Sequence, residues 1–156
     1  MDKDINNILS LETIDVRDLQ IENKDNLFKT MAGMFYDAGC IKNEIAFIEA
    51  LYKREKSGST YMGNGLAVPH GKSDTVVKPS IAFIRFKPFI YDKEDNEEAE
   101  IALMLAIPSS TEQKEYIGML ANITRLFLDE EFLVKLKTEK DKNIILNEFK
   151  DRYKNI

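Results

Sequence analysis

The sequence predicts an α/β fold in which one sheet lies between two layers of helices. Two short segments, 80–86 and 100–107, are apolar on both faces, as is usual for strands of a sheet covered on both sides. Other segments carry apolar residues every three or four positions, which is the spacing of amphipathic helices. Strands mixed with covering helices form a three-layer sandwich. A length of 156 residues suits one domain, and we expect residues 1–156 to form it.

The first part of the chain is expected to hold a short strand or extended lead-in at residues 14–16, followed by two helices. The first helix runs from Asn23 to a stop at Gly39, and the second from near Asn43 to a break at residues 57–58. The apolar faces of these helices consist of Leu27, Phe28, Met31, Met34 and Phe35 in the first and of Ala46, Phe47, Ala50 and Leu51 in the second.

Residues 58–71 have a different composition, because four of these fourteen residues are glycines. They contain a short apolar segment, 66–68, whose end is expected to present the following residues in a surface depression. The two apolar strands come next, and the acidic stretch between them, 91–99, is expected to form a loop.

The last third of the chain is expected to be helical. Residues 108–111 end the second strand and start a helix, and Asp129 caps a further helical turn around 132–136. A last amphipathic helix spans roughly 140–153. The apolar sides of the first and last of these helices consist of Ile117, Leu120, Ile123, Leu126 and Phe127, and of Ile144, Ile145, Phe149 and Tyr153.

Composition and charge narrow the functions open to this chain. Hydrophobic residues make up 44% and charged residues 31%, and no apolar run approaches the roughly 20 residues that span a bilayer. The net charge of −5 argues against nucleic acid, which requires concentrated Lys and Arg, and leaves room for a partner with a basic face. The polar N-terminus is unlike a signal peptide, and the single cysteine, Cys40, cannot form an internal disulfide. We expect a cytoplasmic protein without membrane insertion.

The chain contains one histidine, His70, in a setting that favours a functional role. A lone histidine is more often a structural or exposed residue. Here Pro69 restricts the preceding backbone, and Gly63, Gly65 and Gly71 allow the backbone to approach a bulky anion closely. The segment lacks the phosphate-binding pattern Gly-x-x-x-x-Gly-Lys-Ser/Thr, so the glycines by themselves are a weak signal.

The residue types limit the chemistry that His70 can perform. One histidine and one cysteine cannot build a usual zinc site. A Ser-His-Asp hydrolase is possible in principle, because Ser59, Ser73 and several aspartates are present, but no Gly-x-Ser-x-Gly elbow accompanies them. A neutral imidazole can also attack phosphorus as a covalent nucleophile. Such a site needs backbone N–H groups, hydroxyls and an arginine to hold the phosphoryl group.

Residues 63–71, Gly-Asn-Gly-Leu-Ala-Val-Pro-His-Gly, resemble the active-site motif of IIA proteins of the fructose/mannitol class of the bacterial phosphoenolpyruvate:sugar phosphotransferase system (PTS). Residues 54–63, Arg-Glu-Lys-Ser-Gly-Ser-Thr-Tyr-Met-Gly, are similar to the mannitol-type members, and the resemblance covers most of the chain. It implies a mixed, mainly parallel sheet with helices on both faces. It also implies a phosphocarrier that takes a phosphoryl group from phospho-HPr and passes it to a cysteine of the cognate IIB component, which phosphorylates the sugar carried by the membrane component IIC. Neither a metal nor an organic cofactor is implied.

The same resemblance assigns roles to particular residues. His70 is the nucleophile, with the phosphoryl group on Nε2. Arg54, sixteen positions before it, pairs with the phosphoryl group, although an isolated arginine at a helix end is usually a solvated cation. Thr60 offers its hydroxyl to the phosphate or serves a turn, and Gly63 and Gly65 support the phosphate site.

One departure from the family pattern concerns a second histidine. Many relatives carry it near the start of the helix after the third apolar strand, whereas this chain has only His70. Aligning residues 120–127 with that helix places Tyr116 at the missing position. A phenol can donate a hydrogen bond to a phosphoryl oxygen, but it is neutral at pH 7. The alternative role of Tyr116 is that of an ordinary, partly buried aromatic residue.

Two further functions stay open. A regulatory module with the same fold, nitrogen-type or linked to an antiterminator, would use the phosphorylation state of His70 to control a protein partner. An unrelated hydrolase that depends on histidine would turn over model esters without HPr. The sequence leaves open which sugar or polyol is involved and the oligomeric state.

Overall fold

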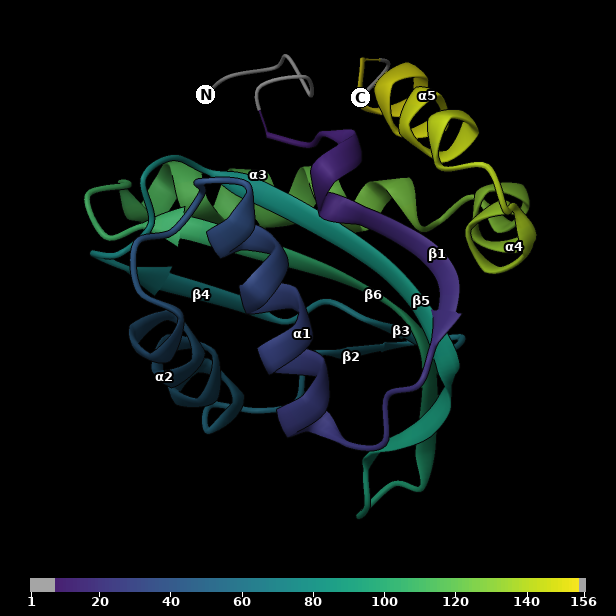
Figure 1. The fold of residues 1–156 in the computed structure, drawn as a ribbon, viewed down its shortest axis with the longest axis horizontal. Coiled ribbons are helices and arrows are strands. Elements are labelled where there is room, and N and C mark those ends of the chain that lie inside the picture. The colour runs from purple at the N-terminus through teal and green to yellow at the C-terminus, as the bar shows by residue number, and fades with distance from the viewer. Residues whose placement is uncertain (1–7, 155–156) are drawn as a thin grey trace.

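The computed structural model describes residues 8–154, and the polar N-terminus 1–7 and residues 155–156 lie outside the described residues. A sheet forms the middle layer, and the helices cover its two faces (Figure 1). One face carries α1 (Lys24–Asp37) and α2 (Glu44–Glu55). The other carries α3 (Gln113–Leu126), α4 (Glu130–Thr138) and α5 (Lys142–Lys154). The predicted three-layer α/β sandwich is therefore confirmed.

The sheet is mixed. Its strands are β1 (Ile14–Leu19), β2 (Tyr61–Gly63), β3 (Leu66–Ala67), β4 (His70–Ser73), β5 (Ser80–Asp92) and β6 (Glu97–Pro108). Their order is β1-β5-β6-β3-β2, and β4 also pairs with β6, beyond β3. The pairs β1/β5, β3/β6 and β4/β6 are parallel, while β5/β6 and β2/β3 are antiparallel. By number of pairings the sheet is mainly parallel, as the family resemblance implied.

The positions of β5 and β6 in the middle of the sheet explain why the segments 80–86 and 100–107 are apolar on both faces. Along β5, Ile81 and Phe83 face the core under α3–α5, whereas Ala82 and Ile84 face the core under α1 and α2. β6 alternates in the same way. Because successive side chains of a strand point to opposite faces, a sheet covered twice favours apolar residues at most positions, and Ser80 and Arg85 are the buried polar exceptions in β5.

The expected loop at 91–99 is wrong. β5 continues to Asp92 and β6 starts at Glu97, so a long hairpin with a turn at residues 93–96 replaces the loop. Phe89 and Ala99 are paired and buried, while the neighbouring polar side chains face outward. An antiparallel hairpin can leave one face in water, and this half-polar pattern resembled a loop in the sequence.

The helices match their predicted positions, with two errors of orientation. Ile117 of α3 was expected on the apolar side of its helix, but it is 56% exposed. The Asn23, Asn43 and Asp129 side chains accept hydrogen bonds from backbone N–H groups and cap α1, α2 and α4. In α5, Ile145 is buried but Ile144 is 41% exposed, so the placement of Ile144 on the apolar side is wrong. The buried line of α5 runs through residues 145, 149 and 153, at a spacing of four, and its neighbour at 144 is turned aside.

Gly71 lets α2 approach the sheet closely. A Cβ atom at this position would lie 3.2 Å from Cε1 of Phe47 and 3.3 Å from the Leu51 backbone nitrogen, so only glycine leaves α2 room to pack on β4. This packing brings the C-terminal end of α2 next to the first residue of β4. The residues that meet there are Arg54 and His70.

Candidate functional site

His70 is buried, and both nitrogens of its ring have a partner. Nδ1 lies 3.0 Å from the carbonyl oxygen of Val68, and Nε2 lies 2.9 Å from Nε of Arg54. The guanidinium group has only donors, so Nε2 must accept the hydrogen bond from Arg54. The proton of the neutral imidazole then sits on Nδ1, which donates to Val68. The local backbone therefore fixes a tautomer with a lone pair on Nε2.

The surroundings of His70 keep its imidazole neutral. Burial lowers the pKa of His70, and the positive charge of Arg54 lowers it further. The hydrogen bond to the Val68 carbonyl and the charge of Glu55 act in the opposite direction and raise it, but the net pKa shift is downward. A neutral ring with a lone pair on Nε2 is the nucleophilic form of histidine.

Arg54 occupies the last turn of α2 and faces the site. Besides the contact of its Nε with His70, its Nη1 donates to the carbonyl oxygen of Gly58 over 3.0 Å. Gly58 has a φ of 137°, which favours glycine, and it lies where the chain leaves α2. The break after the helix therefore presents the carbonyl that orients the guanidinium group.

A hollow of about 450 Å³ opens beside the His70 ring. Polar residues including Arg54 and Ser57 line it together with apolar residues of α3. Two apolar side chains that line it are exposed, Met62 by 50% and Ile117 by 56%. A polar centre between exposed apolar side chains suits a small anion that is delivered by a protein partner.

Tyr116 lies against His70. The centroids of the two rings are 5.9 Å apart at an interplanar angle of 66°, and Nζ of Lys72 lies 5.6 Å from the Tyr116 centroid. Burial raises the pKa of Tyr116, so its phenol is neutral at physiological pH. The structure thus places Tyr116, which the sequence aligned with the missing histidine, in contact with His70.

Thr60 lines the hollow, but its hydroxyl has partners elsewhere. It is buried, donates to the carboxylate of Glu55 and lies 2.7 Å from the hydroxyl of Tyr91. The sequence analysis missed Glu55 and Tyr91 as residues near the site. Glu55 falls within the motif 54–63, and this was the only signal available for it.

Gly63 is the last residue of β2 and Gly65 lies in the turn to β3, with φ of 94° and 81°. The backbone N–H of Gly65 donates to the Tyr61 hydroxyl over 2.9 Å. In the described part of the chain, the residues that line the hollow do not include these two glycines. Their geometry serves the turn, and their support of a phosphate stays a prediction.

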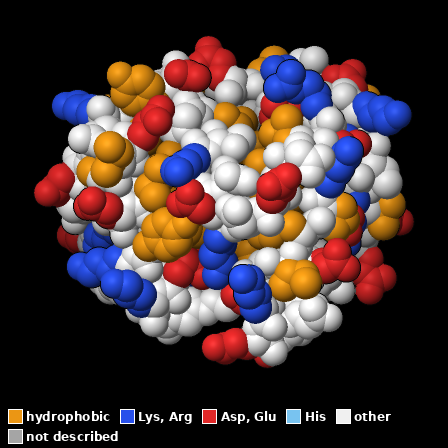
Figure 2. Space-filling model, turned by 60° about the horizontal axis from the view of Figure 1, so that its bottom comes forward, with side chains coloured by type: hydrophobic (Ala, Val, Ile, Leu, Met, Phe, Trp, Pro, Cys, Tyr) orange, Lys and Arg blue, Asp and Glu red, His pale blue; other side chains and the backbone are white. Residues whose placement is uncertain are grey.

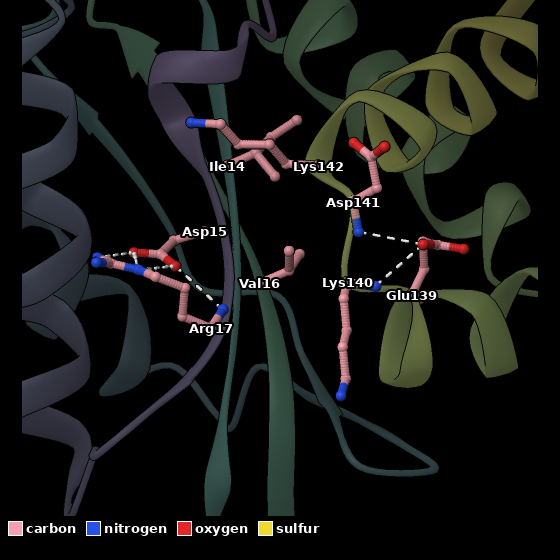
Figure 3. A pocket seen from close by; sticks show the side chains of 8 residues that line it. All are labelled: Ile14, Asp15, Val16, Arg17, Glu139, Lys140, Asp141 and Lys142. Atoms are coloured by element: carbon pink, nitrogen blue, oxygen red, sulfur yellow. Dashed lines mark hydrogen bonds and ion pairs between the residues drawn. The ribbon is translucent and has the colours of Figure 1, made fainter.

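A second, larger hollow of about 840 Å³ lies between β1 and the link from α4 to α5 (Figure 3). Several of its charged side chains have nearby partners. Asp15 pairs with Arg17 at 2.6 Å, and Glu139 accepts from the backbone N–H groups of Lys140 and Asp141. The described residues that line this hollow include no imidazole, thiol or hydroxyl group, in contrast to the hollow beside His70.

Within residues 8–154, no three His, Cys, Asp or Glu side chains gather as a metal site would require, and none of the helices described there is long and apolar enough to cross a membrane. On the face shown in Figure 2, acidic and basic side chains are interspersed among hydrophobic ones.

The fold and the site define an α/β protein that holds one neutral histidine, with a lone pair on Nε2, beside a guanidinium group. Comparison with known families is in accord with this class. The profile described as "Phosphoenolpyruvate-dependent sugar phosphotransferase system, EIIA 2" matches residues 7–152, so the chain belongs to this PTS EIIA family.

Curated relatives include components of sugar systems and a regulator. The fructose-specific EIIA component of Haloferax volcanii is 28% identical over 91% of this chain and 92% of its own length. A nitrogen regulatory protein of Bradyrhizobium diazoefficiens is 32% identical over 67% of this chain and 68% of its own length. The fructose-specific EIIABC component of Bacillus subtilis is 28% identical over 92% of this chain, which spans only 22% of that relative.

Solved structures share the fold. The nitrogen regulatory protein IIA-Ntr of Neisseria meningitidis superposes with a TM-score of 0.82 at 26% identity, covering 92% of this chain and 97% of its own. The mannitol IIA of Escherichia coli, solved in complex with phosphorylated IIB, gives a TM-score of 0.73 at 20% identity, covering 95% and 98%. At that identity the second likeness concerns the fold alone.

Proposed function

We propose that His70 accepts a phosphoryl group on Nε2 from phospho-HPr and passes it to a cysteine of a cognate IIB component, as a cytoplasmic phosphocarrier for sugar uptake. The observation that carries this proposal is the pair of contacts on the ring. Val68 holds the proton on Nδ1, and Nε2 points its lone pair at a guanidinium group 2.9 Å away. The whole chain is proposed to act as one such domain.

The proposed transfer requires a change of partners at Nε2. The lone pair attacks phosphorus, a bond from Nε2 to phosphorus forms, and the bond from phosphorus to the donor's side chain breaks. The ring keeps its proton on Nδ1 and gains positive charge, which the Val68 carbonyl stabilises. The guanidinium of Arg54 exchanges its contact with Nε2 for the phosphoryl oxygens, to which it can donate two parallel hydrogen bonds. Attack by the IIB thiolate on phosphorus reverses these steps.

Membership of the PTS EIIA family supports a role in phosphoryl transfer. The complex of a mannitol IIA protein with phosphorylated IIB supports IIB as the acceptor, and a multiphosphoryl transfer protein of Salmonella typhi among the relatives supports HPr as the donor. The names of the relatives include fructose, mannitol and mannosylglycerate systems, so the sugar stays open.

A regulatory role is the second candidate. The nitrogen regulatory proteins of Bradyrhizobium diazoefficiens and Neisseria meningitidis are as similar to this chain as the sugar components are. In that case His70 would still accept the phosphoryl group, but its phosphorylation state would control a protein partner. Neighbouring genes for IIB and IIC would favour transport, and transfer from the phosphorylated chain to that IIB would establish it.

The direct test is incubation with phosphoenolpyruvate, enzyme I and HPr, followed by intact-mass measurement. We expect a gain of one acid-labile phosphoryl group and no gain in His70→Ala. No gain in the parent, under conditions that phosphorylate a known IIA protein, would contradict the proposal. A hydrolase would instead turn over model esters in the absence of HPr.

A further inference from the structure

A buried carboxylate, that of Glu55, contacts Thr60, which lines the hollow beside His70. The Glu55 side chain is 8% exposed, although carboxylates are seldom buried unless they are paired. It accepts hydrogen bonds from the Thr60 hydroxyl and from the Tyr91 hydroxyl at 2.8 Å, and Nζ of Lys24 lies 3.2 Å from its other oxygen. These three donors come from the segment after α2, from β5 and from α1. Glu55 therefore links the segment after α2 to α1 and β5, whose contacting residues lie 31 and 36 positions away in the sequence.

One branch of this cluster reaches Nδ1 of His70. The carbonyl oxygen of Thr60 accepts from the backbone N–H of Val68 at 2.9 Å. The carbonyl of the same Val68 accepts from Nδ1 of His70 at 3.0 Å. The hydroxyl of Thr60 is held by Glu55, so the carboxylate fixes the peptide that in turn fixes the tautomer of the imidazole.

The other branch reaches Nε2 through Arg54. The Arg54 guanidinium is oriented by the carbonyl of Gly58, which lies between Glu55 and Thr60 in the chain. Ser59 in the same segment donates to Asp92, and Asp92 pairs with Lys24 at 3.1 Å. The segment 57–60 is thus held by two side-chain contacts, from Ser59 to Asp92 and from Thr60 to Glu55.

We infer that Glu55 is a positioning residue, which through Thr60 and Tyr91 sets the tautomer of His70 and the placement of Arg54. Its role in transfer rests on the proposed phosphocarrier function, but its effect on the imidazole does not. Tyr91 suits this arrangement because burial and the charge of Glu55 raise its pKa, so its hydroxyl keeps the proton that it donates.

The single histidine makes the inference measurable without interference, since only one imidazole contributes signals. Nitrogen-15 NMR of the ring would compare the parent with Glu55→Gln, Thr60→Val and Tyr91→Phe. We expect the parent to show the tautomer protonated on Nδ1 and the variants to show a mixture of tautomers. Thr60→Ser, which keeps the hydroxyl, should restore the parent signals, and Glu49→Gln, an exposed carboxyl on the same helix, should leave them unchanged.

Transfer rates provide the second measurement. Because small displacements of a reacting group slow reactions steeply, Glu55→Gln should lower the maximal rate of phosphoryl acceptance from phospho-HPr roughly 10- to 100-fold. The KM for phospho-HPr should change little, since Glu55 is buried away from a partner. Thermal unfolding identifies any variant that fails to fold. If Glu55→Gln does not fold, the comparison of Thr60→Val with Thr60→Ser tests the inference instead.

The outcomes separate the two proposals. An unchanged tautomer and an unchanged rate in folded Glu55→Gln and Thr60→Val would overturn the positioning role while leaving His70 as the carrier. A changed tautomer in the variants, together with a parent protein that accepts no phosphoryl group, would support the positioning role and overturn the proposed function. A loss of rate in Thr60→Val that Thr60→Ser does not restore would contradict the role of the hydroxyl.

Discussion

Nε of Arg54 lies 2.9 Å from Nε2 of His70, so the guanidinium group covers the ring nitrogen that faces the hollow. A phosphoryl group on Nε2 must displace this contact. The proposed site therefore has two arrangements of Arg54, one on the bare imidazole and one on the phosphoryl oxygens. The side chain can change between them while its helix stays fixed, because an arginine has several rotatable bonds.

Replacing Arg54 is expected to slow transfer strongly. Arg54→Met removes the donors that stabilise the phosphoryl group, and loss of such a donor usually costs about 10²- to 10³-fold in rate. Arg54→Lys keeps the positive charge but lacks the planar guanidinium group, so its transfer rate should lie between those of the parent and Arg54→Met. Stopped-flow transfer from phospho-HPr measures both. The pKa of His70 should rise in the Met variant, because Arg54 lowers it. A parent-like rate in Arg54→Met would exclude Arg54 from the site.

Tyr116→Phe tests the substitute for the missing histidine. The ring that contacts His70 stays, and only the phenol hydroxyl is lost. We expect phosphorylation to remain possible but to become slower, by an amount typical of one neutral hydrogen bond, about two- to tenfold. Rates of phosphohistidine formation in the two proteins provide the measurement. Equal rates would show that Tyr116 only packs against the imidazole.

The lowered pKa of His70 has a consequence for stability. Below pH about 6.5 the unfolded chain binds a proton on this residue that the folded protein resists, so the unfolded state holds more protons. The free energy of unfolding should therefore fall as pH drops from about 6.5 toward the folded pKa, by at most about 1.4 kcal/mol per pH unit. Above pH about 6.5, His70 should not contribute to the change of the unfolding free energy with pH.

Urea unfolding of the parent and His70→Gln at several pH values checks this expectation. The difference in unfolding free energy between the two proteins isolates the histidine from the carboxyl groups, which titrate in both. We expect the difference to change with pH below about 6.5 and to be constant above it. A parent that gains stability relative to His70→Gln on acidification would indicate a raised pKa and contradict the assigned surroundings.

Gly71→Ala should disturb the contact between α2 and β4. The added Cβ would lie 3.2 to 3.3 Å from Phe47, Ala50 and Leu51, and we expect a loss of about 1–3 kcal/mol of stability together with slower transfer. Gly118→Ala is the matched control, because in α3 a Cβ meets nothing within 4 Å. It should be neutral or stabilise by up to about 1 kcal/mol. Chemical denaturation measures the stability of both variants. Equal stability of Gly71→Ala and Gly118→Ala would contradict the close packing of α2 on β4.

The fold was largely predictable because its signals are local. The caps at Asn23, Asn43 and Asp129 act on N–H groups two or three residues ahead, so spacing alone locates the helices. The hairpin at 91–99 was missed because its polar residues face water on one side of a long antiparallel pair. That arrangement depends on the pairing of β5 with β6, of which residues 91–99 contain only the ends.

The site was predictable where one motif carries it. His70 and Arg54 lie sixteen residues apart within matching segments, and the structure brings their side chains into contact. The hydrogen bond from the Tyr91 hydroxyl to Glu55 joins residues 36 positions apart, and it forms only when the fold places β5 next to the end of α2. No periodicity in the sequence records such a contact.

The most direct test of the central claim is NMR of the phosphorylated, nitrogen-15-labelled protein, observing coupling between phosphorus and the ring nitrogens of His70. We expect a bond from phosphorus to Nε2, with the proton still on Nδ1 and hydrogen-bonded to the carbonyl oxygen of Val68. Phosphorus on Nδ1, on another residue, or absent after incubation with active phospho-HPr would contradict it.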